Sequence, residues 1–142
     1  MVELLIIADD LTGAIETGVQ LAKQGISSKV VLNPNVDFQR IFAEIDCSVL
    51  IVNTESRHIP PKEAAGRVTD VLKKAQLADV SKFYKKTDST LRGNIGAELE
   101  AFLHETTQRA LAFIPAHPIL KRFTRKGFHN IDEQLLHETE FA

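Results

Sequence analysis

The stretch from Lys85 to Asn94 holds the densest collection of reactive side chains in the sequence. It reads Lys-Lys-Thr-Asp-Ser-Thr-Leu-Arg-Gly-Asn and so combines three cations, a carboxylate, three hydroxyls and an amide. A polyhydroxylated anion requires this mixture, because cations bind its carboxylate while Asp, Asn and Ser orient its hydroxyls. The alternative is a solvated basic loop in which Asp88 or Ser89 only caps the next helix.

Two adjacent carboxylates, Asp9 and Asp10, end the first apolar run of the chain and precede Thr12 and Gly13. Such a pair can bind a metal, hold substrate hydroxyls or act as a base. The Thr-Gly step can lead into a helix N-terminus, which attracts anions. The alternative is that one Asp merely caps that helix. The doubled acid followed by Thr-Gly favours the functional interpretation.

A third polar cluster, Asn53-Thr54-Glu55-Ser56-Arg57, directly follows an apolar run at residues 49–52. The Arg57 guanidinium is suited to clamp a carboxylate with two parallel hydrogen bonds. The alternative is an ordinary polar loop that caps the following helix, and position alone does not decide between the two.

The elements that must position these clusters follow from apolar periodicity. Short continuous apolar runs predict strands at residues 2–8, 29–32, 48–52, 80–84 and 110–114, and helical spacing predicts helices over 14–24, 37–45, 60–78 and 95–105. This alternation predicts an α/β fold: a three-layer, doubly wound, mainly parallel sheet of about five strands with helices on both faces. Ligands of such sheets bind beyond the carboxyl ends of the strands, where the three polar clusters stand.

Residues 115–142 show no clear apolar period, so no regular element is predicted there. A structureless stretch of this length is unusual inside a compact domain. We therefore expect residues 1–142 to form a single domain that is incomplete.

Composition limits the class of protein. The net charge of −2 argues against a nucleic-acid partner. No apolar run approaches the roughly 20 residues of a membrane span, and the apolar start lacks the basic segment of a signal peptide. Cys47 is the single cysteine, which excludes an internal disulfide and is most simply a small core residue. These features predict a cytoplasmic protein without a membrane partner.

Several catalytic signatures are missing from the sequence. It contains no phosphate-binding P-loop, no G-x-G-x-x-G and no G-x-S-x-G elbow. Its five histidines show no metal-ligand spacing, so we expect no metal site. The acid pair resembles that of haloacid-dehalogenase phosphatases and of receiver domains only weakly. The former space the acids by one residue, and the latter need an Asp where this chain has Asn53.

Three segments together resemble one family. Residues 8–14 (Ala-Asp-Asp-Leu-Thr-Gly-Ala), 53–57 and 86–96 (Lys-Thr-Asp-Ser-Thr-Leu-Arg-Gly-Asn-Ile-Gly) are similar to the amino-terminal domain of the four-carbon acid sugar kinases, and the closing His-Glu-Thr-Glu-Phe-Ala is similar as well. The resemblance implies ATP- and magnesium-dependent phosphorylation of a terminal hydroxyl of threonate, erythronate or a close relative. It also implies that the amino-terminal domain binds the sugar acid, whereas a separate domain, absent from this chain, binds ATP.

One segment departs from the family pattern. The family carries Pro-Ala-Phe-Pro, a short gap, then Gly-Arg and a Thr, whereas this chain has His117 in place of the aromatic residue and Lys121 in place of the glycine. Lys cannot adopt at no cost the backbone conformations open to Gly. The departure therefore bears on the geometry of this loop and on any substrate contact that it makes.

The residues and the resemblance together define a site. The predicted catalytic residues are Asp9 and Asp10, as base or charge-positioning groups, and the predicted substrate-binding residues are Arg57, Lys86, Asp88, Ser89, Arg92 and Asn94. ATP and Mg²⁺ are expected to bind mainly outside this chain, which alone is expected to be inactive, and a homo-oligomer is a possible assembly. The alternative functions are a non-catalytic binding module and an inactive remnant of such a kinase.

Overall fold

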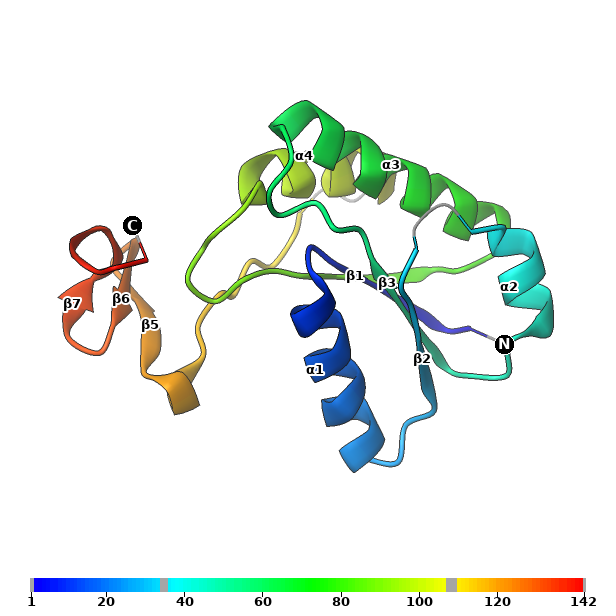
Figure 1. Ribbon diagram of the computed structural model, residues 1–142, viewed down its shortest axis with the longest axis horizontal. Coiled ribbons are helices and arrows are strands. Elements are labelled where there is room, and N and C mark those ends of the chain that lie inside the picture. The colour runs from blue at the N-terminus through cyan, green and yellow to red at the C-terminus, as the bar shows by residue number, and fades with distance from the viewer. Residues whose placement is uncertain (1, 34–35, 107–109, 142) are drawn as a thin grey trace.

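The computed structural model describes residues 2–33, 36–106 and 110–141 and shows a parallel sheet with a smaller antiparallel sheet beyond one end (Figure 1). The main sheet consists of β1 (Leu4–Ala8), β2 (Ser28–Val31), β3 (Val49–Asn53) and β4 (Lys82–Lys86). These strands lie in the order β2-β3-β1-β4 and pair in parallel. The predicted α/β class with a parallel sheet is confirmed.

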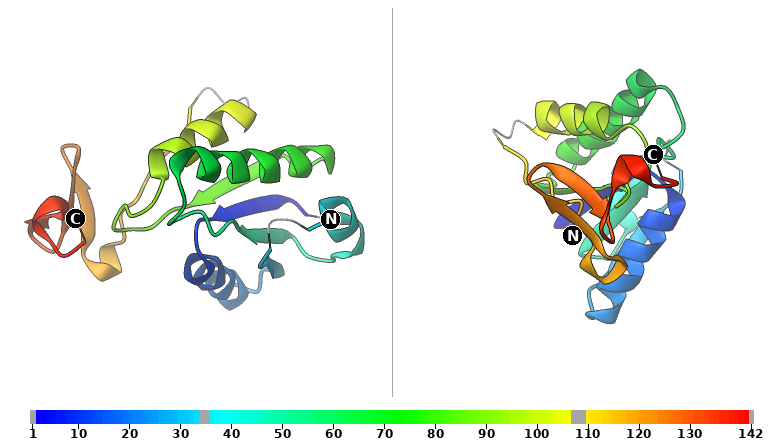
Figure 2. Two further views of the ribbon diagram at one scale, coloured as in Figure 1. Left: turned by 45° about the horizontal axis from the view of Figure 1, so that its top comes forward. Right: turned by 90° about the vertical axis from the view of Figure 1, so that its left-hand side faces the viewer.

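Helices cover both faces of the main sheet, so the three predicted layers are present. Figure 2 shows α1 (Leu11–Lys23) on one face of the sheet and α3 (Pro61–Leu77) with α4 (Ile95–Thr106) on the other. The short helix α2 (Phe38–Glu44) contacts α3. Proline is tolerated at the start of α3 because the first turn of a helix has no use for its missing N–H.

The core explains why the central strands read as continuous apolar runs. Successive side chains of a strand point to opposite faces of the sheet. Leu5 and Ile7 accordingly pack in the core cluster that includes α3 and α4, whereas Ile6 and Ala8 pack with Ala14 of α1. Because helices cover both faces of the sheet, side chains that point to either face are buried.

The register of the strands aligns their carboxyl ends. Ala8 at the end of β1 pairs with Asn53 at the end of β3 and with Lys86 at the end of β4. The polar segments that follow these three strands therefore begin side by side at one edge of the sheet.

The prediction of a fifth strand at residues 110–114 is wrong. In the described part of the chain the main sheet has four strands, and β4 pairs with β1 alone. The segment instead passes a hollow that it lines together with Phe83 and Phe102, without forming a ladder. An apolar run indicates burial but does not specify a hydrogen-bonding partner. Here even the burial is incomplete, since Ile114 is 78% exposed.

The expectation of no regular element after residue 114 is also wrong. A small antiparallel sheet is formed there by β5 (Arg122–Arg125), β6 (Phe128–Ile131) and β7 (Gln134–Leu135), flanked by the 3₁₀ helices η1 (Pro118–Leu120) and η2 (Leu136–Glu138). We call residues 117–141 the arm; residue 142 lies outside the described residues. Figures 1 and 2 show the arm beyond the edge at which the main strands end.

Candidate functional site

The three polar segments predicted to carry chemistry meet at the carboxyl edge of the main sheet. Together with the start of the arm they border an open cleft of about 830 Å³. Its wall includes six of the predicted site residues, Asp10, Arg57, Lys86, Asp88, Ser89 and Arg92. The other two predicted residues do not line the cleft: Asp9 contacts Arg57 of its wall, and Asn94 contacts the carbonyls of Ser56 and Ile59.

Arg57 lies between the two adjacent carboxylates. Its Nε and Nη2 donate to the Asp9 carboxylate at 2.7 and 3.1 Å, and its Nη1 donates to Asp10 at 2.6 Å. Burial alone would lower the pKa of Arg57, but the hydrogen bond and the negative charges of Asp9 and Asp10 raise this pKa above its ordinary value. The guanidinium expected to clamp a ligand carboxylate thus already holds two carboxylates of the chain.

Asp10 has two structural contacts. One carboxylate oxygen accepts the N–H of Gly13 at 2.8 Å and caps α1, and the other accepts from Arg57. A Cβ at position 13 would stand 2.8 Å from that capping oxygen, so glycine allows the close approach. The capping interpretation therefore holds for Asp10, although its side chain, 22% exposed, also reaches the cleft.

Asp88 forms a second carboxylate–arginine pair on the loop after β4. Arg92 donates to its two oxygens from Nε at 2.6 Å and from Nη2 at 3.1 Å, and the Thr90 hydroxyl donates at 2.5 Å. Burial would raise the pKa of Asp88, but these hydrogen bonds and the charges of Arg92 and Arg57 hold it well below its ordinary range. The Asp88 carboxylate therefore fixes Arg92 beside the cleft.

The loops after β3 and β4 are braced against each other. The Asn94 amide donates to the carbonyls of Ser56 and Ile59, each at 2.8 Å. Gly93 has φ of 91°, a conformation that favours glycine, and a Cβ there would lie close to Arg57 Cγ, at 3.2 Å. Two non-glycine residues of these loops, Glu55 and Leu91, also have left-handed backbone, with φ of 47° and 59°.

Lys86 and Ser89 also line the cleft, but no carboxylate among the described residues holds them as the three aspartates hold the arginines. Lys86 Nζ donates to the Thr87 carbonyl at 3.3 Å and lies 3.9 Å from a carboxylate oxygen of Glu16. Its side chain is 25% exposed. The Ser89 hydroxyl meets the arm, as described below.

A buried polar network that sequence reasoning missed lies beneath the cleft. Lys85 Nζ contacts Glu98 at 3.0 Å, and both side chains are 1% exposed. The Ser56 hydroxyl donates to the other Glu98 oxygen, and Thr54 bonds both Ser56 and the Ala8 carbonyl. The network ties β4, α4 and the β3–α3 loop together. No sequence signal marks Glu98, which stands among the apolar residues of an amphipathic helix.

Two arm residues also contact the predicted loop. Arg122 Nη1 donates to the Ser89 hydroxyl, and His129 Nε2 donates to the Ser89 carbonyl at 2.8 Å, while His129 Nδ1 lies 3.0 Å from Thr124 Oγ1. Arg122 follows Lys121, which replaces the family's glycine and has φ of 54°. The only signal for Arg122 was therefore the Gly-Arg of the family pattern, and no signal marked His129.

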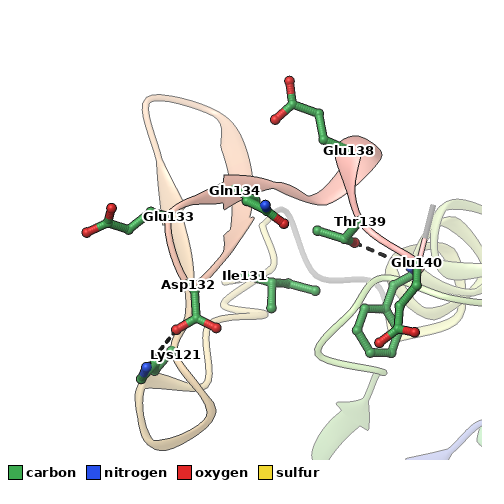
Figure 3. A pocket seen from close by; sticks show the side chains of 9 residues that line it. Lys121, Ile131, Asp132, Glu133, Gln134, Glu138, Thr139 and Glu140 are labelled. Carbon is green, nitrogen blue, oxygen red and sulfur yellow. Dashed lines mark hydrogen bonds and ion pairs between the residues drawn. The ribbon is translucent and has the colours of Figure 1, made fainter.

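A second hollow lies within the arm and shares no residue with the cleft. Figure 3 shows its carboxylates, on Asp132, Glu133, Glu138 and Glu140, pointing away from one another rather than toward a common centre. Across the described residues no group of three or more His, Cys, Asp or Glu is arranged to hold a metal.

The three aspartates predicted for the site do not fit a magnesium ion either. Asp9, Asp10 and Asp88 are each paired with an arginine, so their oxygens are already engaged. We assign no metal-dependent step to these residues. Separately, none of the described helices has the length and apolar character to cross a membrane.

Residues 4–142 match the family described as the sugar-binding N-terminal domain. The chain belongs to this family. The match confirms the expected resemblance.

The relatives of this sugar-binding domain are larger proteins. A D-threonate kinase of Salmonella typhimurium is 38% identical over 141 residues, covering 99% of this chain and 32% of the kinase. A D-erythronate kinase of Heliobacterium modesticaldum is 36% identical over 143 residues, covering 100% and 32%. The chain thus spans about a third of the length of these curated relatives.

A solved structure shares the fold of the sugar-binding domain. A protein of Bordetella bronchiseptica, crystallised with bound citrate as a domain-swapped dimer, superposes with a TM-score of 0.87 at 32% identity. The superposition covers 97% of this chain and 35% of that one.

Proposed function

We propose that the cleft binds a four-carbon sugar acid of the threonate or erythronate type, and that the chain is the sugar-acid-binding part of an ATP-dependent kinase. The observation that carries the proposal is the convergence of three sequence-distant polar segments on one cleft. The family match and the names of the two kinases support it.

The residues around the cleft divide into positioning and ligand-facing groups. Asp9, 2% exposed, holds Arg57, and Arg57 in turn holds Asp10 at the cleft. Asp10 is the acid that reaches the cleft, so we assign it, rather than Asp9, to the hydroxyl that would accept phosphate. Lys86 and Arg92 supply positive charge for the anionic ligand or the transferred phosphate.

The remaining predicted residues shape the same surface. Asp88 fixes Arg92, Asn94 fixes the neighbouring loop, and Ser89 offers a hydroxyl at the cleft. Phosphoryl transfer depends mainly on positioning and electrostatics, so holding the accepting hydroxyl still is a sufficient task for this domain. We propose that ATP and Mg²⁺ bind in the part of such a kinase that this chain does not include, and that the chain alone transfers no phosphate.

A non-catalytic binding module or an inactive remnant is the second candidate. Lys121 favours it, because this non-glycine residue occupies a left-handed position immediately before the arm strand that borders the cleft.

We also propose self-association, which the domain-swapped dimer of the Bordetella bronchiseptica relative supports. Sedimentation velocity of the purified chain measures it, and a concentration-independent monomer would contradict it.

Calorimetric titration with D- and L-threonate and D- and L-erythronate tests the binding function. The expected result is saturable binding of at least one acid, with no comparable binding of the neutral polyols threitol and erythritol. Arg92→Ala should weaken that binding by roughly ten- to a hundredfold, because a charge-assisted contact is lost. A folded chain that bound none of the four acids would contradict the proposal, and turnover with ATP would contradict the expected inactivity.

A further inference from the structure

Arg122 is the first residue of β5 and brings a guanidinium from the arm to the wall of the cleft. The arm reaches the cleft by a contact with the β4–α4 loop, in which Arg122 Nη1 donates to the Ser89 hydroxyl. The side chain is neither free in solvent nor part of the buried network beneath the cleft.

The charges around the cleft set Arg122 apart from the other cations of the wall. Arg57 is held by Asp9 and Asp10, and Arg92 is held by Asp88. Lys86 lies at the outer limit of an ion pair, 3.9 Å from Glu16. Within residues 2–33, 36–106 and 110–141, no carboxylate lies within 4.0 Å of the Arg122 guanidinium.

A second observation concerns the same side chain. Arg122 Nε is screened from solvent and has no hydrogen-bond partner among the described residues. A buried donor without an acceptor is unfavourable. The guanidinium also lies over the Phe141 ring, 5.8 Å from its centroid, but this contact gives Nε no acceptor and supplies no carboxylate counter-charge.

We propose that Arg122 binds the carboxylate of the sugar acid. The inference rests on the proposed function of the cleft and adds a residue to it, in the place that sequence reasoning gave to Arg57. Arg57 is neutralised by the acids of the chain itself, whereas Arg122 carries the charge and the planar donor geometry that a carboxylate matches.

Ser89 acts with Arg122. Its hydroxyl oxygen accepts from Arg122 Nη1, so the hydroxyl hydrogen is directed to a different acceptor, and an oxygen of the same ligand carboxylate suits it. His129 holds the Ser89 backbone, since a carbonyl only accepts and Nε2 must carry the proton. The carboxylate then binds on the arm side of the cleft, with the hydroxyl chain directed toward Asp10.

Three variants test this assignment. Arg122→Gln removes the charge, and Arg122→Lys keeps the charge but lacks the planar guanidinium. Arg125→Gln is the control, because it removes a charge from an exposed position of the same strand. Each is titrated with D-threonate and D-erythronate and with the matching neutral carboxamides. Arg122→Gln should weaken the acids by roughly ten- to a hundredfold while the weak carboxamide binding stays unchanged. Arg122→Lys should lie between the two, and Arg125→Gln should match the natural chain.

The outcomes separate the two proposals. Equal affinity of the acids for the natural chain and for Arg122→Gln overturns the role of Arg122 and leaves the proposed function standing. No binding of any acid to the natural chain overturns both. Should Arg122→Gln fail to fold, the Nε–H resonance of Arg122 in the natural chain decides. A saturable shift of this resonance with D-threonate supports the contact, and a signal that stays in place while the acid binds overturns it.

Discussion

Arg57 and Asp9, 48 residues apart in the sequence, form a two-pronged ion pair at the carboxyl edge of the sheet. The Asp9 carbonyl also accepts the backbone N–H groups of Ser56 and Arg57, at 2.9 and 3.2 Å. Side-chain and backbone bonds thus join the end of β1 to the loop after β3. This junction determines the shape of one wall of the cleft.

Asp9→Asn should reduce the free energy of unfolding by about 3 kcal/mol, because it leaves a largely buried guanidinium with one neutral partner in place of a carboxylate. Urea denaturation followed by circular dichroism measures the change. Glu44→Gln is the matched control, since it breaks the Arg40–Glu44 pair, in which both side chains are more than half exposed. The control should lose less than about 1 kcal/mol. Similar losses in the two variants would show that the Asp9–Arg57 pair stabilises the chain no more than an exposed ion pair does.

Glu98→Gln should destabilise the chain by about 3–5 kcal/mol, because Lys85 would remain charged and buried without its counter-ion. Replacing both partners, as Lys85→Met with Glu98→Leu, should cost less than the single change, since no buried charge is left. Thermal unfolding of the three variants gives the comparison. A double variant that is less stable than Glu98→Gln would contradict this account of the pair.

The lowered pKa of Asp88 should make the free energy of unfolding decrease as the pH falls into the acid range. Its folded pKa lies below the ordinary value of 3.8, so its contribution is complete above that value and is lost as the pH falls toward the lower folded pKa. The stability difference between the natural chain and Asp88→Asn should therefore be largest above about pH 4 and shrink at lower pH. Asp70→Asn, at an exposed position of α3, is the control and should show no such convergence.

Lys121→Gly should stabilise the chain by about 0.5–1 kcal/mol. Relief of a left-handed conformation gains more than the added flexibility of glycine costs in the unfolded state. Lys121→Ala separates this effect from loss of the exposed ion pair with Asp132, since alanine keeps the backbone strain. Differential scanning calorimetry should rank glycine above alanine. The reverse order would mean that the left-handed backbone at position 121 costs less than the added flexibility of glycine in the unfolded state.

The main sheet could be predicted because its signals are local. β1 and β3 are buried on both faces and so appear as unbroken apolar runs, and α3 carries its buried residues at helical spacing. The arm was missed because its strands are short and partly exposed. The one available signal, Lys126-Gly127 between two short runs, matches a two-residue hairpin turn, and both residues have positive φ.

The position of the site followed from the rule for parallel sheets, but its internal pairing did not. Residue types indicated that Arg57 would clamp a carboxylate, yet not that the carboxylates would be those of Asp9 and Asp10. That choice depends on the strand register, which sets residues far apart in sequence side by side. The contacts of Glu98 with Lys85 and of Arg122 with Ser89 likewise depend on the fold and could not be predicted from the sequence.

Glu55 and Leu91 are the left-handed non-glycine residues of the loops around the cleft. At both positions we expect a trade-off between the stability of the fold and the proposed ligand binding. Left-handed backbone at such residues costs about 1–3 kcal/mol and persists where the surroundings enforce it. Glycine at either position would remove that cost but would let the loop leave the shape that presents the ligand-facing groups. Laboratory evolution that selects for heat resistance alone should therefore accumulate glycine at these positions, whereas selection for the proposed sugar-acid binding should retain the strained residues.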